Sequence, residues 1–229
     1  MDIETNIMRT CLTGRSQDHL ATLNPQCLLH KDVLAPWVEL VQRAAGAGFD
    51  LRAASGFRSF AKQLLIWNGK ARGRYPVLDD HGNPLDLMTM SKLDRMWAIL
   101  RWSALPGTSR HHWGTDMDIW DAAAVPPAYA LQLTPAEWAP GGPFNPLDRW
   151  LMEQTAAGSS EFFRPYAEDR GGVAPEAWHL SYRPLALQFA RALSPGLVRT
   201  LIGVSDIALK DVILSHLDEI FARFVRTPD

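Results

Sequence analysis

The sequence predicts an α+β fold, in which helices surround a small antiparallel sheet. Three observations support this prediction: apolar residues recur at helical spacing in several segments, short strand-like runs stand between those segments, and glycines and prolines separate them. The chain has 229 residues, enough for one sizeable domain or two small ones. We find no internal repeat and no low-complexity tract.

The first elements are a helix and a strand. Residues 31–47 place apolar side chains on one helical face, and Gly46 and Gly48 are expected to end that helix. Residues 49–54 then predict a short strand. Further helices are expected at residues 60–68 and 91–102, with a loop rich in Gly, Pro and Asp at 70–86.

The second half of the chain contains a long irregular stretch. A strand is expected at residues 115–119, where polar and apolar residues alternate. Prolines recur through residues 121–147, so we predict a long surface connection there. The remaining predictions are a helix at 147–157, a strand at 178–182, a helix at 185–192 and one long amphipathic helix at 197–224.

These elements predict a division of the chain into three parts. Residues 1–30 give no strong periodic signal and are expected to form an arm or short helices over the core. Residues 31–190 form the predicted core. Residues 191–229 are predicted to be a helical extension packed on the same domain.

Composition limits the possible functions. Hydrophobic residues make up 47% and charged residues 21% of the chain, which is typical of a well-packed globular protein. The net charge of −2 and the pI of about 6.4 provide no positive field for nucleic acid. No run approaches the roughly 18 apolar residues of a membrane span.

The N-terminus and the cysteines bear on the compartment. The N-terminal residues as written do not resemble a signal peptide, so we expect a cytoplasmic protein, or one of the periplasm or cell envelope if a leader was removed. Cys11 and Cys27 are too few for a disulfide framework and are expected to be buried or free thiols. We expect a monomer.

Candidate metal ligands gather between Ser109 and Asp118. In a helix, His111 and Asp118 would lie about 10 Å apart along the axis, too far to share an ion. The chain must fold back if they bind one metal, and Gly114 suits such a bend. In the following strand Asp116 shares a face with Asp118, so this geometry leaves either aspartate as the ligand and the other as its neighbour.

A second group of candidates follows at residues 176–182. His179 supplies a third possible ligand, and Glu176 lies three residues before it. Two histidines and one carboxylate leave the fourth position of a tetrahedral zinc ion open for water. Glu176 would then accept the proton of that water and return it to a leaving amine.

Three motifs occur in a characteristic order. They read S-G-F-R-S with a glutamine from Ser55 to Gln63, S-x-H-x-x-G-x-x-x-D from Ser109 to Asp118, and E-x-W-H-x-x-Y from Glu176 to Tyr182. In these motifs the chain resembles the VanY-type D-alanyl-D-alanine carboxypeptidases, within the wider zinc DD- and LD-peptidase family. The resemblance covers roughly residues 31–190.

The resemblance implies roles for these residues. It implies that His111, Asp118 and His179 bind Zn²⁺ and that Glu176 is the general base. By the same resemblance Arg58 lies near the scissile group, where it binds a carboxylate or stabilises the oxyanion. Substrate contacts are expected from the positions that match substrate-binding ones or flank the site: Gln63, Ser109, Trp178 and Tyr182. Asp116 departs from the family pattern, in which a small apolar residue is common.

The implied function is hydrolysis of the C-terminal D-alanine of a peptidoglycan stem peptide or muropeptide. The motifs do not distinguish a D,D bond from an L,D bond. Two alternatives are a peptidoglycan endopeptidase or lysin, and a peptidoglycan-binding module that has lost catalysis. His112 is not expected to bind the metal, because the side chains of adjacent residues diverge.

Overall fold

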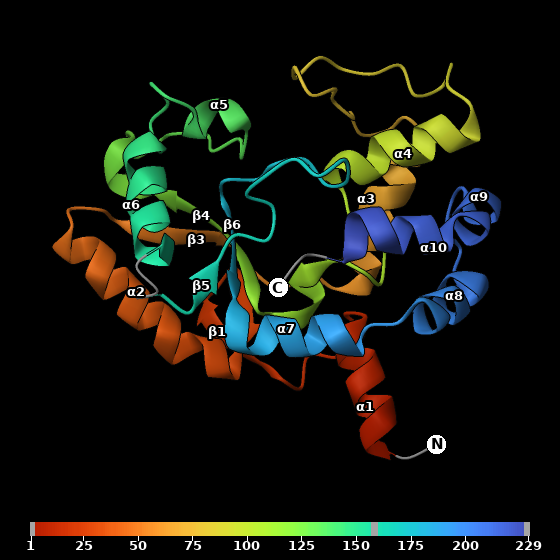
Figure 1. Cartoon of the computed structure of the whole chain (residues 1–229), viewed down its shortest axis with the longest axis horizontal. Helices are drawn as coiled ribbons and strands as arrows, with labels where there is room; N and C mark the ends of the chain where they lie inside the picture. Colours follow the sequence, from red (N-terminus) through yellow and green to blue (C-terminus); the bar gives the residue numbers. More distant parts are fainter. Residues whose placement is uncertain (1–2, 157–159, 227–229) are drawn as a thin grey trace.

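The computed structural model describes residues 3–156 and 160–226 and confirms the α+β fold. A four-stranded sheet lies at its centre, with strand order β3-β4-β6-β5 and antiparallel pairing throughout. Helices lie to either side of this sheet (Figure 1). The strands are β3 (Leu51–Ser55), β4 (Asp116–Asp121), β5 (Phe162–Phe163) and β6 (His179–Tyr182).

The helices of the central part of the chain agree closely with the predicted segments, with one exception. Ser59 and Ser91 cap two of these helices, because each hydroxyl accepts a hydrogen bond from a backbone N–H in the first turn. The helices are α2 (Leu34–Gly46), α3 (Phe60–Ala71), α4 (Lys92–Trp102), α5 (Pro135–Trp138), α6 (Asn145–Ala156) and α7 (Arg183–Ala192). The exception is the short helix α5, which lies in the stretch 121–147 that was predicted to be a surface connection, and Trp138 and Phe144 of that stretch are buried because they pack in the core. Residue 157, the predicted end of α6, lies outside the described residues.

The N-terminal segment contains a hairpin that the sequence did not predict. Helix α1 (Ile3–Leu12) precedes strands β1 (Leu20–Asn24) and β2 (Cys27–His30), which pair antiparallel. The hairpin is tied to the core, because the N–H of His30 donates to the carbonyl of Gly114 over 2.8 Å. This part of the chain therefore supports the bend at Gly114.

The predicted helix over residues 197–224 is wrong. The structure instead contains α8 (Pro195–Val204), α9 (Lys210–Ser215), α10 (Leu217–Ile220) and a π-helical turn at Phe221–Val225. Helix α3 explains the first break, because Trp67 donates to the carbonyl of Ala208 and Asn68 bonds to the backbone of residues 206 and 208. These bonds satisfy backbone groups that a continuous helix would have paired within itself.

Two apolar clusters hold the sheet and its helices together. One cluster lies under α2 and α6 and includes Trp37, Ile119 and Phe144. The other joins α3 and α4 to the C-terminal helices through residues such as Trp67 and Ile202. The C-terminal helices are therefore packed on the same core as α3, whose side chains reach the site.

The structure also bears on the two cysteines and on membrane-spanning helices. Cys11 and Cys27 are both buried and free, as predicted. Across the described parts of the chain, every helix is too short or too polar to cross a lipid bilayer.

Candidate metal centre and its cavity

Adjacent strands bring part of the candidate metal centre into one row. Asp118 on β4 stands opposite Ser55 at the end of β3 and opposite His179 at the start of β6. His111 comes from the short 3-10 helix Arg110–Trp113, which ends at Gly114 in the left-handed conformation, with φ of +71°. The chain reverses direction at that turn before it enters β4, so the side chain of His111 lies beside that of Asp118.

The three candidate ligands converge in the structure. One ligand atom from each of His111, Asp118 and His179 lies within 4.8 Å of the other two, and all three side chains are buried. Nε2 of His111 is 3.6 Å from Oδ2 of Asp118, and Nδ1 of His179 is 3.7 Å from Oδ1 of the same carboxylate. One ion with bonds of about 2 Å fits among these atoms after small side-chain rotations.

Hydrogen bonds at the far side of each ring fix which nitrogen faces the centre. Nδ1 of His111 lies 2.8 Å from the carbonyl oxygen of Gly56, so we assign the ring proton to Nδ1, which donates it in a hydrogen bond. The lone pair of Nε2 is then available to bind a metal ion. Nε2 of His179 lies 3.0 Å from Oδ1 of Asp116, which turns Nδ1 toward Asp118 and Glu176. Such outer contacts orient metal-binding histidines and raise their basicity.

Asp116 is fully buried and is held as an anion. Nε of Arg110 donates to its Oδ1 over 2.7 Å, and the Thr115 hydroxyl donates to its Oδ2 over 2.6 Å. Burial opposes the charged carboxylate, but Arg110, His179 and Thr115 outweigh it and hold the pKa of Asp116 well below its usual range. Asp116 is therefore the partner of His179 on the side away from Asp118.

Asp118 is also stabilised as a carboxylate. Burial opposes its charge, but His111, His179 and the hydroxyl of Ser55 keep its pKa well below the ordinary range. A buried carboxylate beside two imidazole nitrogens is a donor set that suits zinc.

Glu176 stands beside the candidate ligands. Its Oε2 lies 3.2 Å from Nδ1 of His179. Burial lowers the stability of charged His179, but its bonds to Asp116 and Glu176 outweigh that effect and raise the pKa of His179 to about 9. In the metal-free protein His179 therefore carries a proton near neutral pH, and a metal ion must displace it.

Arg58 lies at the edge of the centre. Its Nη2 is 3.9 Å from Oδ2 of Asp118, and its Nη1 donates to Oε1 of Gln63 over 3.2 Å. Gln63 is fully buried and donates its amide N–H to the carbonyl of Ala104 over 2.7 Å. Gln63 therefore orients Arg58 from behind.

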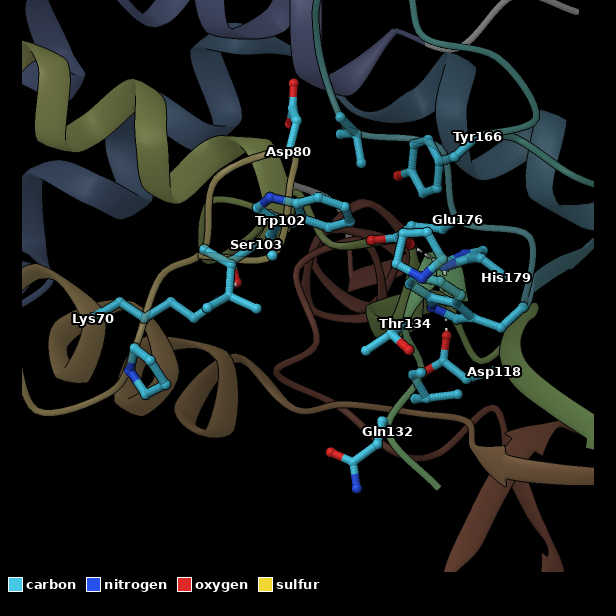
Figure 2. Close-up of a pocket in the computed structure, with 18 of the residues that line it drawn as sticks. Lys70, Asp80, Trp102, Ser103, Asp118, Gln132, Thr134, Tyr166, Glu176 and His179 are labelled. Carbon is cyan, nitrogen blue, oxygen red and sulfur yellow. Dashed lines mark hydrogen bonds and ion pairs between the residues drawn. The ribbon is translucent and has the colours of Figure 1, made fainter. Parts of the chain in front are cut away.

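A cavity of about 610 Å³ opens next to these residues. Its lining includes Arg58, Glu176 and the three candidate ligands. In Figure 2 Glu176, His179 and Asp118 stand together on one side, and Lys70 and Ser103 stand on the other. The volume lies within the range of sites that hold a small-molecule ligand.

The residues predicted to contact a substrate fall into two groups. Ser109 and Trp178 line the cavity. Gln63 and Tyr182 are not among the lining residues. Tyr182 packs on Phe162, and its hydroxyl donates to Glu161 over 3.3 Å, so it belongs to the core on the other side of the sheet.

Several lining residues were not singled out from the sequence. Residues 76 and 78–82 of the predicted loop line the cavity, and so do residues 132–136 of the predicted surface connection. Tyr166 packs its ring edge-on against His179, with centroids 4.9 Å apart, and Lys70 comes from the end of α3. None of these positions lies in a motif, and only long-range packing brings them to the cavity.

His112 has a structural role next to the centre. Its Nδ1 lies 2.6 Å from the carbonyl oxygen of Arg58, and its Nε2 accepts a hydrogen bond from the N–H of Gly107. Both ring nitrogens are therefore occupied. Burial lowers the pKa of His112 to about 3, which keeps the ring neutral.

Comparison with known proteins assigns the chain to a family of peptidases. A family model, VanY, described as D-alanyl-D-alanine carboxypeptidase, matches residues 26–185. The match covers more than half of the chain, and the chain belongs to the VanY family.

Solved structures have the same fold. The chain matches VanYB in complex with D-alanine-D-alanine with a TM-score of 0.51 at 22% identity, over 81% of this chain and 89% of that one. For the LdcB LD-carboxypeptidase the TM-score is 0.51 at 19% identity, over 86% of this chain and 77% of that one. For a mutant of the D,D-pentapeptidase VanY in complex with Zn(II), the TM-score is 0.50 at 21% identity. That match covers 86% of this chain and 92% of the other.

Two sequence relatives come from Haemophilus influenzae, and both are uncharacterised proteins. One is 43% identical over 98 residues, which span 41% of this chain and 67% of the relative. The other is 34% identical over 123 residues, which span 53% of this chain and 92% of the relative.

Proposed function

We propose that this protein is a zinc-dependent carboxypeptidase that releases a C-terminal D-alanine from peptidoglycan stem peptides. The observation that carries the proposal is the convergence of His111, Asp118 and His179 on a cavity that Glu176 also lines. Membership of the VanY family supports the reaction class. Similar folds bind Zn(II) and D-alanine-D-alanine, which supports the metal and the substrate class.

The candidate ligands fit zinc by their chemistry. Hydrogen bonds on the far side of each ring turn one imidazole nitrogen of His111 and one of His179 toward the centre, and the third ligand atom is a carboxylate oxygen. Zinc bound by these residues would supply a Lewis acid and would make water a nucleophile near neutral pH. Three protein ligands are the number found in catalytic zinc sites, where a fourth position stays open.

Glu176 is the residue that moves the proton in this proposal. Its carboxylate lies 3.2 Å from Nδ1 of His179, at the wall where the attacking water must sit. It accepts a proton from that water and delivers it to the nitrogen of the leaving D-alanine. The residue acts first as a base and then as an acid.

Arg58 supplies positive charge on the other side of the reacting group. Its guanidinium faces the cavity while Gln63 holds one nitrogen in place. A guanidinium in that position stabilises the negative charge that develops on the carbonyl oxygen during attack. Because Gln63 is itself bonded to the Ala104 carbonyl, the position of Arg58 is set before substrate binds.

The cavity walls support a short substrate rather than a long chain. Residues of the 76–82 and 132–136 segments line the same cavity of about 610 Å³ as the candidate metal ligands. Arg101 joins the first of these segments to the 169–172 loop by ion pairs with Asp80 and Asp169. Walls of this kind favour release of a terminal residue over cleavage within a cross-linked wall.

The test is a substrate panel with zinc-loaded protein. We expect release of D-alanine from at least one of three compounds: a stem pentapeptide, a stem tetrapeptide and D-alanyl-D-alanine. The pentapeptide and tetrapeptide also distinguish a D,D bond from an L,D bond. Glu176→Gln should lower kcat by at least about 100-fold with zinc still bound, because it removes the proton acceptor.

A matched control is Glu168→Gln, in an exposed loop near the same part of the chain, which should retain the parent rate. Cleavage of intact walls without D-alanine release would favour an endopeptidase. Parent protein that holds zinc and cleaves none of these substrates would refute the proposal.

A further inference from the structure

Lys70 is a cation on the wall of the cavity. Its Nζ donates to the hydroxyl of Ser103 over 2.6 Å, and the residue lines the cavity. Among the residues that the structure describes, no carboxylate lies within ion-pair distance of this ammonium. A partly buried charge whose hydrogen-bond partner is neutral is costly, and a ligand of opposite charge offsets that cost.

The two aspartates of the 76–82 segment, which lines the same cavity as Lys70, already have partners. Asp79 accepts hydrogen bonds from the backbone N–H groups of His81 and Asn83. Asp80 is held by the guanidinium of Arg101. The wall formed by residues 76–82 therefore provides no free anion for Lys70.

Lys70 and Arg58 belong to one connected arrangement. Gln63 and Lys70 lie two helical turns apart on α3, so they share a face of that helix. Gln63 holds Arg58 and the carbonyl of Ala104, while Lys70 holds the adjacent Ser103. One helix face and one short segment thus fix both cations.

The electrostatic environment agrees with this placement. Burial and the charge of Arg58 lower the pKa of Lys70, and Glu176 opposes them. Lys70, Arg58 and Glu176 all line the same cavity. Lys70 also stands across the cavity from Glu176 and His179 (Figure 2).

We propose that Lys70 binds the C-terminal carboxylate of the substrate, which leaves Arg58 to stabilise the charge on the scissile carbonyl. The inference rests on the proposed carboxypeptidase function and assigns a specificity-determining residue to it. The Ser103 hydroxyl holds the ammonium in place. A peptide without a free terminal carboxylate would leave Lys70 unpaired and would be a poor substrate.

The test combines a change in the enzyme with a change in the substrate. Lys70→Met and the parent are compared on N-acetyl-D-alanyl-D-alanine and on its C-terminal carboxamide. We expect the parent to prefer the acid by about 100-fold in kcat/KM, because a charged hydrogen bond is lost with the amide. In Lys70→Met the preference should fall below about tenfold, mainly through a higher KM for the acid.

Two further variants serve as controls. Lys62→Met removes an exposed lysine of the same helix and should keep the parent's preference. Lys70→Arg keeps a positive charge and should retain most of the parent's preference for the acid over the amide. If Lys70→Met slows the acid and the amide equally, or leaves the preference unchanged, Lys70 does not bind the carboxylate.

A binding titration separates this inference from the proposed function. The acid and the amide are titrated calorimetrically into Glu176→Gln protein, with and without Lys70→Met. Tighter binding of the acid that disappears with Lys70→Met supports the carboxylate site, even if the parent releases no D-alanine. Equal binding of acid and amide, or no binding of either, overturns it.

Discussion

Nε2 of His179 lies 3.0 Å from Oδ1 of Asp116, and this buried pair separates the roles of the two aspartates in the motif. Both aspartates lie on the same face of β4, but only Asp118 joins the group with His111. Asp116 instead contacts the opposite nitrogen of His179 and is held there by Arg110. In this chain it is the residue that directs Nδ1 of His179 toward the candidate metal position.

From this relationship we predict that Asp116→Asn weakens zinc binding by about 10- to 100-fold without preventing the fold. The amide keeps the shape of the side chain but removes the charge that raises the basicity of His179. Competition with a chelator of known zinc affinity measures the loss. Asp118→Asn should lower affinity further, because it alters a ligand. Equal zinc affinity in Asp116→Asn and the parent would contradict this role.

Gly114 offers a test of the turn that precedes the strand. Its φ of +71° is strained for other residues, and an added Cβ would lie 2.5 Å from a Leu20 side-chain atom and 2.7 Å from the His30 nitrogen. We expect Gly114→Ala to destabilise the protein by about 2 kcal/mol or more and to weaken zinc binding. Chemical denaturation of the metal-free protein measures the first effect.

Gly46→Ala is the matched control for that substitution. This glycine is in α2, and an added Cβ meets nothing within 4 Å. The same chemical change should raise stability by about 0.4–1 kcal/mol, because alanine restricts the unfolded chain. If both variants shifted stability in the same direction, the conformation at Gly114 would not be the cause.

His112 predicts a pH dependence of stability in the metal-free protein. Its folded pKa of about 3 lies below the ordinary value of 6.5, so the unfolded state binds more protons between these values. The contribution of His112 is complete above pH 6.5 and declines as the pH falls toward 3. Between pH 6.5 and pH 5 the free energy of unfolding should fall by about 2 kcal/mol through this residue.

Denaturation of the parent and of His112→Gln across that pH range tests this prediction. The variant should be less stable at pH 7, because glutamine does not reproduce both ring contacts, but its stability should change less with pH. His19, whose pKa burial lowers to about 4, contributes in the same direction and remains in both proteins. Parallel pH curves for the two proteins would show that His112 is not responsible.

We predict that Arg101, which lies outside the reaction centre, affects substrate binding. Its guanidinium donates to Asp80 and Asp169 and to the carbonyl of Gly172, and so joins two loops beside the cavity. Arg101→Ala should raise KM several-fold and change kcat less, because the walls loosen while the metal ligands stay in place. Arg199→Ala, which removes an exposed ion pair elsewhere, should leave both constants unchanged. A fall in kcat with KM unchanged would contradict this account.

The sequence alone was sufficient for much of the fold and for the identity of the candidate site. Apolar periodicity located α2, α3, α4 and α6, because a surface helix shows its buried face in its residue spacing. The three motifs singled out His111, Asp118 and His179, which the structure brings together. Motif residues are visible because the site needs particular residue types at fixed positions.

Tertiary structure decided what depends on contacts between distant segments. The long C-terminal helix was a wrong prediction. Trp67 and Asn68 form hydrogen bonds with the backbone of Ala208, and apolar periodicity within the C-terminal segment carries no information about these distant partners. Spacing left Asp116 and Asp118 equivalent, since both occupy one strand face, and only the position of His179 on the neighbouring strand distinguishes them. Lys70 reaches the cavity for the same reason: its position is set by how α3 packs, which no local pattern encodes.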